Sequence, residues 1–422
     1  MPGSRRLTTH PRPRLPRRSR VVGSLLWIAL VVAASASHAA EPTVVLWDLR
    51  HIEKVRAGAA DSDGIRHALR RLKSYADTAL DRGPYSVVFK DELAPSGDRH
   101  DYISFSRYWW PNPDTDDGLP YVRRDGVVNR SLVERGDRTP IGMMMDDVEA
   151  LTLAGYFFDD DRYSRHAAEL VRVWFLEAKT RMNPHLRFGQ AVPGRAVGRG
   201  VGVIDTRSFI RVLDSVELLH SAGLLASEDR AALAEWFRSY LDWLLESDLG
   251  QEEEQAENNH GSWHAAQAGR IAVFVGRDDL ARQIVTKVID QRLQRQIDDQ
   301  GRQPHELKRS ISLHYSVFNL LALSTAARVG EAVGLDAWRC PEDDPALLRA
   351  LRYLEPYLAG EQEWPHPMLK PYKISPRQAQ ILYLGAMKYQ APELLELLKA
   401  IPKRRSETDF NELVYRGAEN HE

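Results

Sequence analysis

The sequence is poor in cysteine. Cys340 is the only cysteine in 422 residues, which excludes an intrachain disulfide. The fold must therefore be stabilised by its core alone. We expect Cys340 to be a buried apolar residue rather than a nucleophile.

An excess of charge of one sign is also lacking. The chain has 57 Lys and Arg against 59 Asp and Glu, for a formal net charge of −2 at pH 7. Proteins that bind nucleic acid or membrane surfaces in general carry an excess of basic residues. We therefore expect neither as a partner of the mature chain, although a local basic cleft is compatible with this total.

Long hydrophobic runs are missing after residue 34, which excludes an ordinary transmembrane helix there. The one early run, Val21–Ala34, follows seven arginines and precedes Ser37-His38-Ala39. It is too short to span a bilayer, and this order of regions is that of a secretory signal, with an uncleaved anchor as the alternative. We expect residues 1–39 to be a signal peptide and the mature enzyme to be periplasmic or secreted.

Strand-like alternation is scarce, whereas helical periodicity is abundant. From Asp61 onward, apolar residues recur at three- and four-residue spacing, and glycines separate the segments. Ten later segments show this pattern: Asp146–Phe158, Arg162–Lys179, Ser208–Ala222, Ser227–Asp248, Trp263–Val275, Asp278–Asp299, Tyr315–Val333, Pro345–Leu358, Pro376–Tyr389 and Pro392–Ile401. Such helical hairpins without a linker predict one all-α solenoid or toroid over residues 40–403. We expect residues 404–422 to form a loose polar tail.

The densest group of chemically capable side chains is Glu257–Gln267, which reads Glu-Asn-Asn-His-Gly-Ser-Trp-His-Ala-Ala-Gln. It precedes an apolar helical segment, so Asn258 or Asn259 is a natural N-cap. A cap needs only one of these residues. The others would place donors at the positive end of a helix dipole, which suits a carboxylate. The stretch predicts either a polar cap or an anion site.

An irregular stretch, Ser96–Asn129, is rich in aspartate, proline and aromatic residues and includes Tyr108, Trp109 and Trp110. A loop of this length inside a compact domain is usually functional. Aromatic side chains so close together can stack on sugar rings, or they can pack inward and plug one end of the fold. Both interpretations remain open at this stage.

Two further stretches contain candidate site residues. Met182–Arg207 holds Gln190 and a Gly-Arg-Gly-x-Gly run at Gly198–Gly202, with Arg199 at its second position. No strand precedes this run and no Lys-Ser/Thr follows it, so it is not a phosphate loop. His305–Phe318 places Arg309 and Tyr315 six residues apart. Ordinary structural roles for these residues are the alternative.

The four stretches resemble, in the same order, alginate lyases with an α/α-toroid fold and related polyuronate lyases. The likeness runs from about Ser96 to Tyr315. It implies an all-α fold, an incomplete α/α barrel of antiparallel helix pairs, with the aromatic stretch in the cleft wall and lid. The matching positions are Asn258, Asn259, His260 and Trp263; Asp101, Tyr102, Ser104 and Tyr108–Pro111; Asn183–Leu186, Gln190 and Gly198–Gly200; and Arg309 with Tyr315.

The resemblance implies β-elimination on a uronic-acid polymer, without a cofactor or a metal. The C5 proton leaves only if the neighbouring carboxylate is neutralised, and the leaving O4 must gain a proton. By resemblance, Asn259 and Gln190 hold the carboxylate, supported by Arg309 or by Lys308. Asn258, Trp263, Tyr108, Trp109, Trp110 and Arg199 are the expected substrate contacts.

The same resemblance makes Tyr315 the acid, and also the base where the proton and the leaving group share a face. His260 is then the base on the opposite face, or it neutralises charge and polarises Tyr315. The sequence does not separate these roles. A free tyrosine ionises near pH 10, so a cation such as Arg309 would have to lower its pKa.

The expected partner is an anionic polysaccharide: alginate, in its mannuronate-rich blocks, with glucuronan as the second choice. Three other classes remain as alternatives. His260 and His264 have the i, i+4 spacing of a metal pair. A glycoside hydrolase would use two carboxylates. A non-catalytic glycan-binding protein would keep the aromatic residues without the His, Tyr and Arg. The sequence does not set the oligomeric state.

Overall fold

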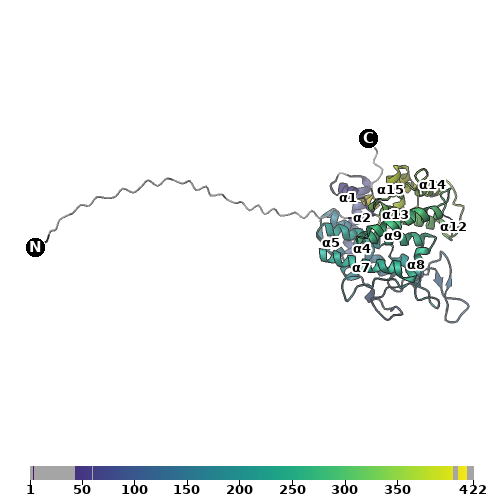
Figure 1. The fold of residues 1–422 in the computed structure, drawn as a ribbon, viewed down its shortest axis with the longest axis horizontal. Coiled ribbons are helices and arrows are strands. Elements are labelled where there is room, and N and C mark those ends of the chain that lie inside the picture. Colours follow the sequence, from purple (N-terminus) through teal and green to yellow (C-terminus); the bar gives the residue numbers. More distant parts are fainter. Residues whose placement is uncertain (1–2, 4–42, 59, 403–406, 416–422) are drawn as a thin grey trace. The chain divides into compact units, whose positions relative to one another are not determined.

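The computed structural model describes residues 3, 43–58, 60–402 and 407–415. The predicted signal peptide, residues 1–39, falls outside these residues except for Gly3. The described residues between 43 and 415 form one compact unit (Figure 1). Within the described part of the chain, no helix is both long and apolar enough to cross a membrane.

The described chain is built mainly of antiparallel helices, which confirms the predicted all-α class. The longer helices are α2 (Asp63–Ala79), α4 (Arg138–Phe158), α5 (Asp161–Phe175), α6 (Phe209–Ser221), α7 (Ser227–Glu246), α9 (Asn259–Phe274), α10 (Asp278–Lys287), α13 (Ser312–Ala332), α14 (Ala346–Leu358) and α15 (Pro376–Tyr389). The shorter ones are α1 (Leu49–Arg56), α3 (Arg130–Val133), α8 (Asp248–Gln255), α11 (Gln294–Gln296), α12 (Pro304–Leu307), α16 (Glu393–Ala400) and α17 (Asn411–Val414).

Two helices form the centre of the molecule. α9 and α13 pack against each other, and α9 also contacts α6, α7, α8 and α10. Nearly all residues of α9 are buried, because small residues such as Gly261 and Ala265 let the neighbouring elements approach closely. This central position fixes the first turn of α9 firmly, and that turn contains the Asn-Asn-His sequence.

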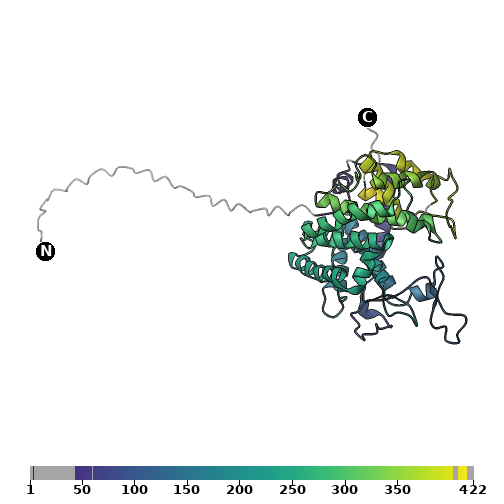
Figure 2. The same ribbon diagram turned by 45° about the vertical axis from the view of Figure 1, so that its right-hand side comes forward.

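The two irregular stretches meet in a small β-structured region beside the helices (Figure 2). Strand β1 (Ile103–Phe105) pairs in parallel with β4 (Phe188–Ala191), and β2 (Trp109–Trp110) pairs antiparallel with β3 (Val122–Arg123). A separate apolar cluster supports them and includes Phe105, Leu132 and Phe188. The β1–β4 pairing therefore joins the aromatic stretch to the stretch that contains Gln190.

The structure differs from the prediction of a loose tail over residues 404–422. Residues 407–415 are described and fold onto the domain, with Phe410, Leu413 and Tyr415 buried. The Asp48 backbone N–H donates to the carbonyl of Val414 at 2.9 Å. This apolar group is short and is surrounded by polar residues, so the sequence pattern did not indicate it. Burial of its side chains favours packing of this segment onto the domain.

A buried ion pair ties the N-terminal segment to the helices. Asp214 on α6 and Arg270 on α9 are both fully buried and lie 2.8 Å apart. The same carboxylate accepts the backbone N–H groups of Val45 at 3.2 Å and Leu46 at 2.7 Å. Arg270 also donates to the carbonyl of Thr43 at 3.1 Å. This charge pair thus binds three backbone groups of residues 43–46 and joins that segment to α6 and α9.

Asp214→Ala should strongly destabilise the protein, because it leaves Arg270 buried and unpaired. Loss of one partner of a buried pair costs about 3–5 kcal/mol. The midpoint of urea unfolding, followed by circular dichroism, measures the change. Asp242→Ala removes a carboxylate from an exposed pair with Arg277 and serves as the control. Equal midpoints for the two variants would contradict the expected role of Asp214.

Candidate active site

A cavity of about 650 Å³ lies between the helices and the β-structured region. Six residues of α13 line it: His314, Tyr315, Phe318, Leu321, Thr325 and Arg328. The first and the last are fourteen residues apart, or about 21 Å at the usual helical rise. The cavity is therefore long enough for several sugar rings in a row.

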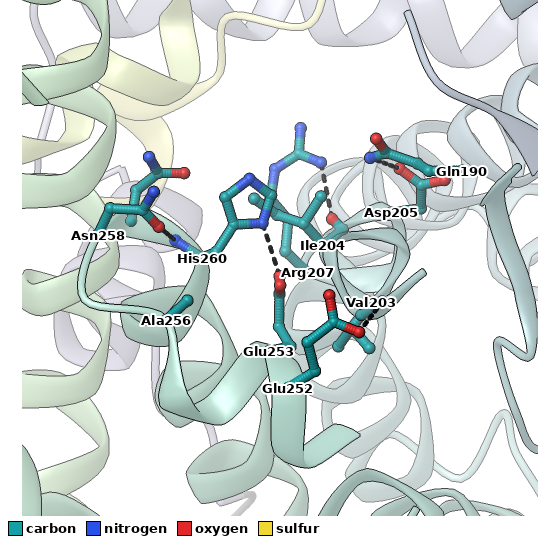
Figure 3. A network of polar contacts seen from close by, with 12 residues as sticks. Gln190, Val203, Ile204, Asp205, Arg207, Glu252, Glu253, Ala256, Asn258 and His260 are labelled. Atoms are coloured by element: carbon teal, nitrogen blue, oxygen red, sulfur yellow. Dashed lines mark hydrogen bonds and ion pairs between the residues drawn. The ribbon is translucent and has the colours of Figure 1, made fainter. Parts of the chain in front are cut away.

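The first turn of α9 supplies one wall of the cavity. Asn258 is the N-cap, and its side chain accepts the backbone N–H of His260 at 3.0 Å. The Nδ1 atom of His260 lies 2.8 Å from the carboxylate of Glu253, which is almost fully buried (Figure 3). A carboxylate at Nδ1 favours the tautomer that carries its proton there, so the Nε2 lone pair is left for the cavity. The predicted cap is therefore confirmed, and the same turn places His260 in the cavity wall.

The position of Asn259 is fixed by hydrogen bonds to Glu306. Its side chain is fully buried, and its amide nitrogen donates to both oxygens of Glu306, at 3.0 and 2.9 Å. Its backbone N–H donates to the same carboxylate at 2.6 Å. The Oδ1 atom of Asn259 has no hydrogen-bond partner within the described residues. Asn259 thus lines the cavity with its amide N–H groups already committed to Glu306.

Gln190 adopts an unusual backbone conformation, with a φ of 49°. Its backbone N–H donates to the Ser104 hydroxyl at 2.8 Å, and its side-chain amide donates to Asp205 at 3.1 Å. Arg199 donates to the Gln190 carbonyl at 3.0 Å. Strain of this kind persists only where several contacts enforce it, and it is common at binding sites. Gln190 and Arg199 are both in the cavity wall.

Tyr315 and Arg309 also line the cavity. The Arg309 guanidinium lies 3.7 Å from the centre of the Tyr315 ring. The Tyr315 hydroxyl lies 3.0 Å from that of Tyr108, which comes from the aromatic stretch. Lys308 is exposed and does not line the cavity, so the geometry favours Arg309 over Lys308 as the supporting cation.

The hydroxyl of Tyr315 is protonated at neutral pH. Burial raises its pKa above 10.0, Tyr108 raises it further, and Arg309 lowers it by less than these two raise it. Arg309 therefore does not bring the pKa of Tyr315 toward neutrality, as the sequence analysis had required for a base. A protonated hydroxyl suits a proton donor.

The aromatic residues divide into two groups. Tyr108, Trp109 and Trp263 line the cavity. Trp263 is 4% exposed and packs on Phe318 with ring centres 5.3 Å apart. Trp110 is not in the cavity wall; its indole donates to the Val127 carbonyl at 3.1 Å. The structure therefore brings together every predicted substrate contact except Trp110.

Arginine dominates the cavity wall. Nine arginines line it, and within the described residues no aspartate or glutamate does: Arg107, Arg123, Arg138, Arg199, Arg207, Arg211, Arg309, Arg328 and Arg377. Only Arg199 and Arg309 had been predicted, because the others follow no motif. The near-neutral total charge conceals a strongly basic cavity.

Six of these arginines are compensated by acidic residues outside the wall. Asp125 pairs with Arg123 and Arg309, Asp205 with Arg138, Glu149 with Arg211 and Arg377, and Glu331 with Arg328. No ion pair is found for Arg107, Arg199 or Arg207 in the described parts of the chain. The cavity therefore carries uncompensated positive charge near Tyr108, Gln190 and His260, where an anion would be stabilised.

The two alternatives that need acidic or metal-binding side chains lack support in this geometry. His264 faces away from the cavity, and its Nε2 lies 3.1 Å from the Leu244 carbonyl. Among the described residues, no group of three His, Cys, Asp or Glu could hold a metal ion. A glycoside hydrolase needs two carboxylates beside the substrate, and the wall just described offers none.

Comparison with known proteins decides the family. Residues 86–364 match the model of the family described as alginate lyase. The chain belongs to the alginate lyase family. It is a polysaccharide lyase, which confirms the predicted enzyme class and excludes a purely binding protein.

Solved structures agree with this assignment. An alginate lyase from Bacteroides ovatus is 33% identical, with a TM-score of 0.82 over 89% of this chain and 99% of that one. Alginate lyase A1-III from Sphingomonas species A1 is 15% identical, with a TM-score of 0.54 over 90% of this chain and 98% of that one. A variant of A1-III in complex with a tetrasaccharide gives 16% identity and a TM-score of 0.58, over 90% and 98% of the chains. The search of curated proteins gave no match. These neighbours confirm the α/α-toroid class.

Asp125 connects the aromatic stretch, Ser96–Asn129, to Arg309 and Ser310. It accepts from Arg309 at 3.0 Å and from the Ser310 hydroxyl at 2.8 Å. Burial alone would raise its pKa, but these hydrogen bonds are stronger and hold the pKa well below 3.8. A lowered pKa means that the contact stabilises the fold above about pH 4 and is lost only in stronger acid. The contact of Asp125 with Arg309 and Ser310 is therefore intact at neutral pH.

Asp125→Ala should lower kcat/KM of the lyase by about 10²-fold, because Arg309 loses its position over Tyr315 and small displacements have effects of this size. The melting temperature should change little, since Asp125 lies on a loop and is partly exposed. Asp116→Ala, on an exposed part of the same loop, is the matched control. If both variants keep wild-type kcat/KM, Asp125 does not position Arg309.

Proposed function

We propose that this lyase cleaves alginate by β-elimination, with mannuronate-rich blocks as the preferred substrate. The observation that carries the proposal is the cavity wall around Tyr315 and His260, with its nine arginines and no carboxylate. Uronate polymers carry one carboxylate per sugar, so a long basic cavity suits them better than neutral glycans. The likeness to the Bacteroides ovatus alginate lyase supports the choice of alginate over glucuronan.

In the proposed reaction, cations and amides of the wall first neutralise the carboxylate of the sugar to be cleaved. Neutralisation lets negative charge develop on that group as the C5 proton leaves. His260 takes this proton through Nε2, while Glu253 stabilises the imidazolium that forms, as a buried carboxylate does for histidine bases. The electron pair then forms the C4–C5 double bond and expels O4.

Tyr315 supplies the proton to O4. Its raised pKa keeps the hydroxyl protonated at neutral pH, so that it is ready to donate. The Tyr108 hydroxyl at 3.0 Å can return a proton to Tyr315 after each turnover. In mannuronate the C5 proton and O4 lie on the same face of the ring, so His260 as base and Tyr315 as acid must both act on that face. We propose that the enzyme acts in the periplasm or outside the cell, where such polymers are found.

Turnover of a polymer panel tests the substrate. Wild-type enzyme should release products that absorb in the ultraviolet, because β-elimination creates a conjugated double bond. Mannuronate-rich alginate should react fastest among alginate blocks, glucuronan, pectate and glycosaminoglycans. A chelator should leave the rate unchanged. If glucuronan reacts fastest, the substrate is glucuronan; if no polymer yields an absorbing product, the proposed reaction is wrong.

Tyr315→Phe should reduce kcat by about 10²–10⁴-fold, the usual contribution of one proton-transfer group. The fold should survive, because a lost tyrosine hydrogen bond costs about 0.5–1.5 kcal/mol. Binding of the polymer should change little. Tyr156→Phe, on α4 and outside this cavity, is the matched control. A Tyr315→Phe enzyme that melts like wild type and keeps most of its kcat would show that Tyr315 is not the acid.

A further inference from the structure

Arg207 is one of the three arginines in the cavity wall for which no ion pair is described. It follows the 3₁₀-helix Gly200–Thr206 and precedes α6. The one described hydrogen bond of its side chain runs from Nη1 to the carbonyl of Ile204, at 3.0 Å. Figure 3 shows its guanidinium beside His260 and pointing into the open space that Gln190 also faces. No sequence motif marked it.

The surroundings of Arg207 are unfavourable for a cation. Burial and the neighbouring charges of Arg138 and Arg107 together lower its pKa to about 10. The nearest opposing charge, Asp205, is already engaged by Arg138 at 2.9 Å and by Gln190 at 3.1 Å. The guanidinium is therefore charged at neutral pH, desolvated on one side and without a carboxylate. Such a group raises the free energy of the folded protein unless a bound anion compensates it.

The donors that the resemblance assigned to the substrate carboxylate are already in use. The amide of Asn259 is bound to Glu306, and the guanidinium of Arg309 is bound to Asp125. The amide of Gln190 is bound to Asp205. Arg207 keeps its Nη2 group without a described partner and projects it beside the base. It is thus the best-placed donor in the wall that a substrate carboxylate can engage without breaking an existing contact.

We infer that Arg207 binds the carboxylate of the uronate whose C5 proton His260 removes. This inference rests on the proposed β-elimination and adds a residue to it. A guanidinium pairs with a carboxylate through parallel N–H donors, and it does not exchange its own proton near neutral pH. Arg207 would therefore supply the neutralising charge at the reacting sugar, while Asn259, Gln190 and Arg309 shape the pocket around that sugar.

The test compares Arg207→Met and Arg207→Lys with wild type. Methionine keeps the apolar contact with Phe318, whose ring lies 5.5 Å from the guanidinium, and removes only the charge. We expect Arg207→Met to lower kcat/KM by about 10²–10³-fold, as for loss of one charge-stabilising donor. Its melting temperature should equal or exceed that of wild type, because a partly buried, unpaired cation is removed. Arg207→Lys should recover part of the activity.

A second substrate separates a charge role from a structural one. Wild type should prefer the free uronate oligomer to its methyl ester, and Arg207→Met should lose this preference by reducing turnover of the free acid alone. Equal losses on both substrates, or a fall in melting temperature that parallels activity, would overturn the inference. Arg70→Met, at an exposed position on α2, controls for the change itself. If wild type is inactive on every uronate polymer, the proposed function fails first; if it is active and Arg207→Met is too, only the role of Arg207 fails.

Discussion

The site depends on carboxylates that stand behind the cavity rather than in it. Asp205 holds Gln190, Glu253 holds His260, Glu306 holds Asn259, and Asp125 holds Arg309. Each acid orients one residue of the wall by a hydrogen bond and keeps its own charge away from the substrate. An anionic polymer thus meets side chains whose positions are fixed before it arrives, which is what electrostatic preorganisation requires.

This arrangement reconciles two facts that look contradictory. The whole chain is nearly neutral, with a formal charge of −2, yet its cavity is lined with arginine. The acidic residues that pair with six of those arginines lie outside the cavity wall. Because charge interactions in a partly desolvated cavity are strong and those across the surface are screened, the substrate responds to the cavity rather than to the total.

Local patterns in the sequence predicted the helices and the main motif well. The cavity wall includes residues of the Asn258–Trp263 motif, Tyr315 and Gln190. Local structure at a helix start or in a tight loop restricts where such side chains can lie. The arginines at 107, 207 and 377 could not be predicted, because they meet only through tertiary packing. Glu253 belongs to an acidic run, Glu252–Glu254, that is typical of a solvated helix face, and its burial comes from the 3₁₀-helix and α9 that pack on α8. The burial of Phe410–Tyr415 likewise depends on partners far away in the sequence.

The meeting of the two chain ends has a consequence for how the enzyme becomes active. Leu46 and Tyr415 both line the cavity, and Asp48 is hydrogen bonded to Val414. Contacts between such distant positions form late in folding, because the loop between them must close first. The cavity is therefore incomplete until nearly the whole chain has emerged from the ribosome.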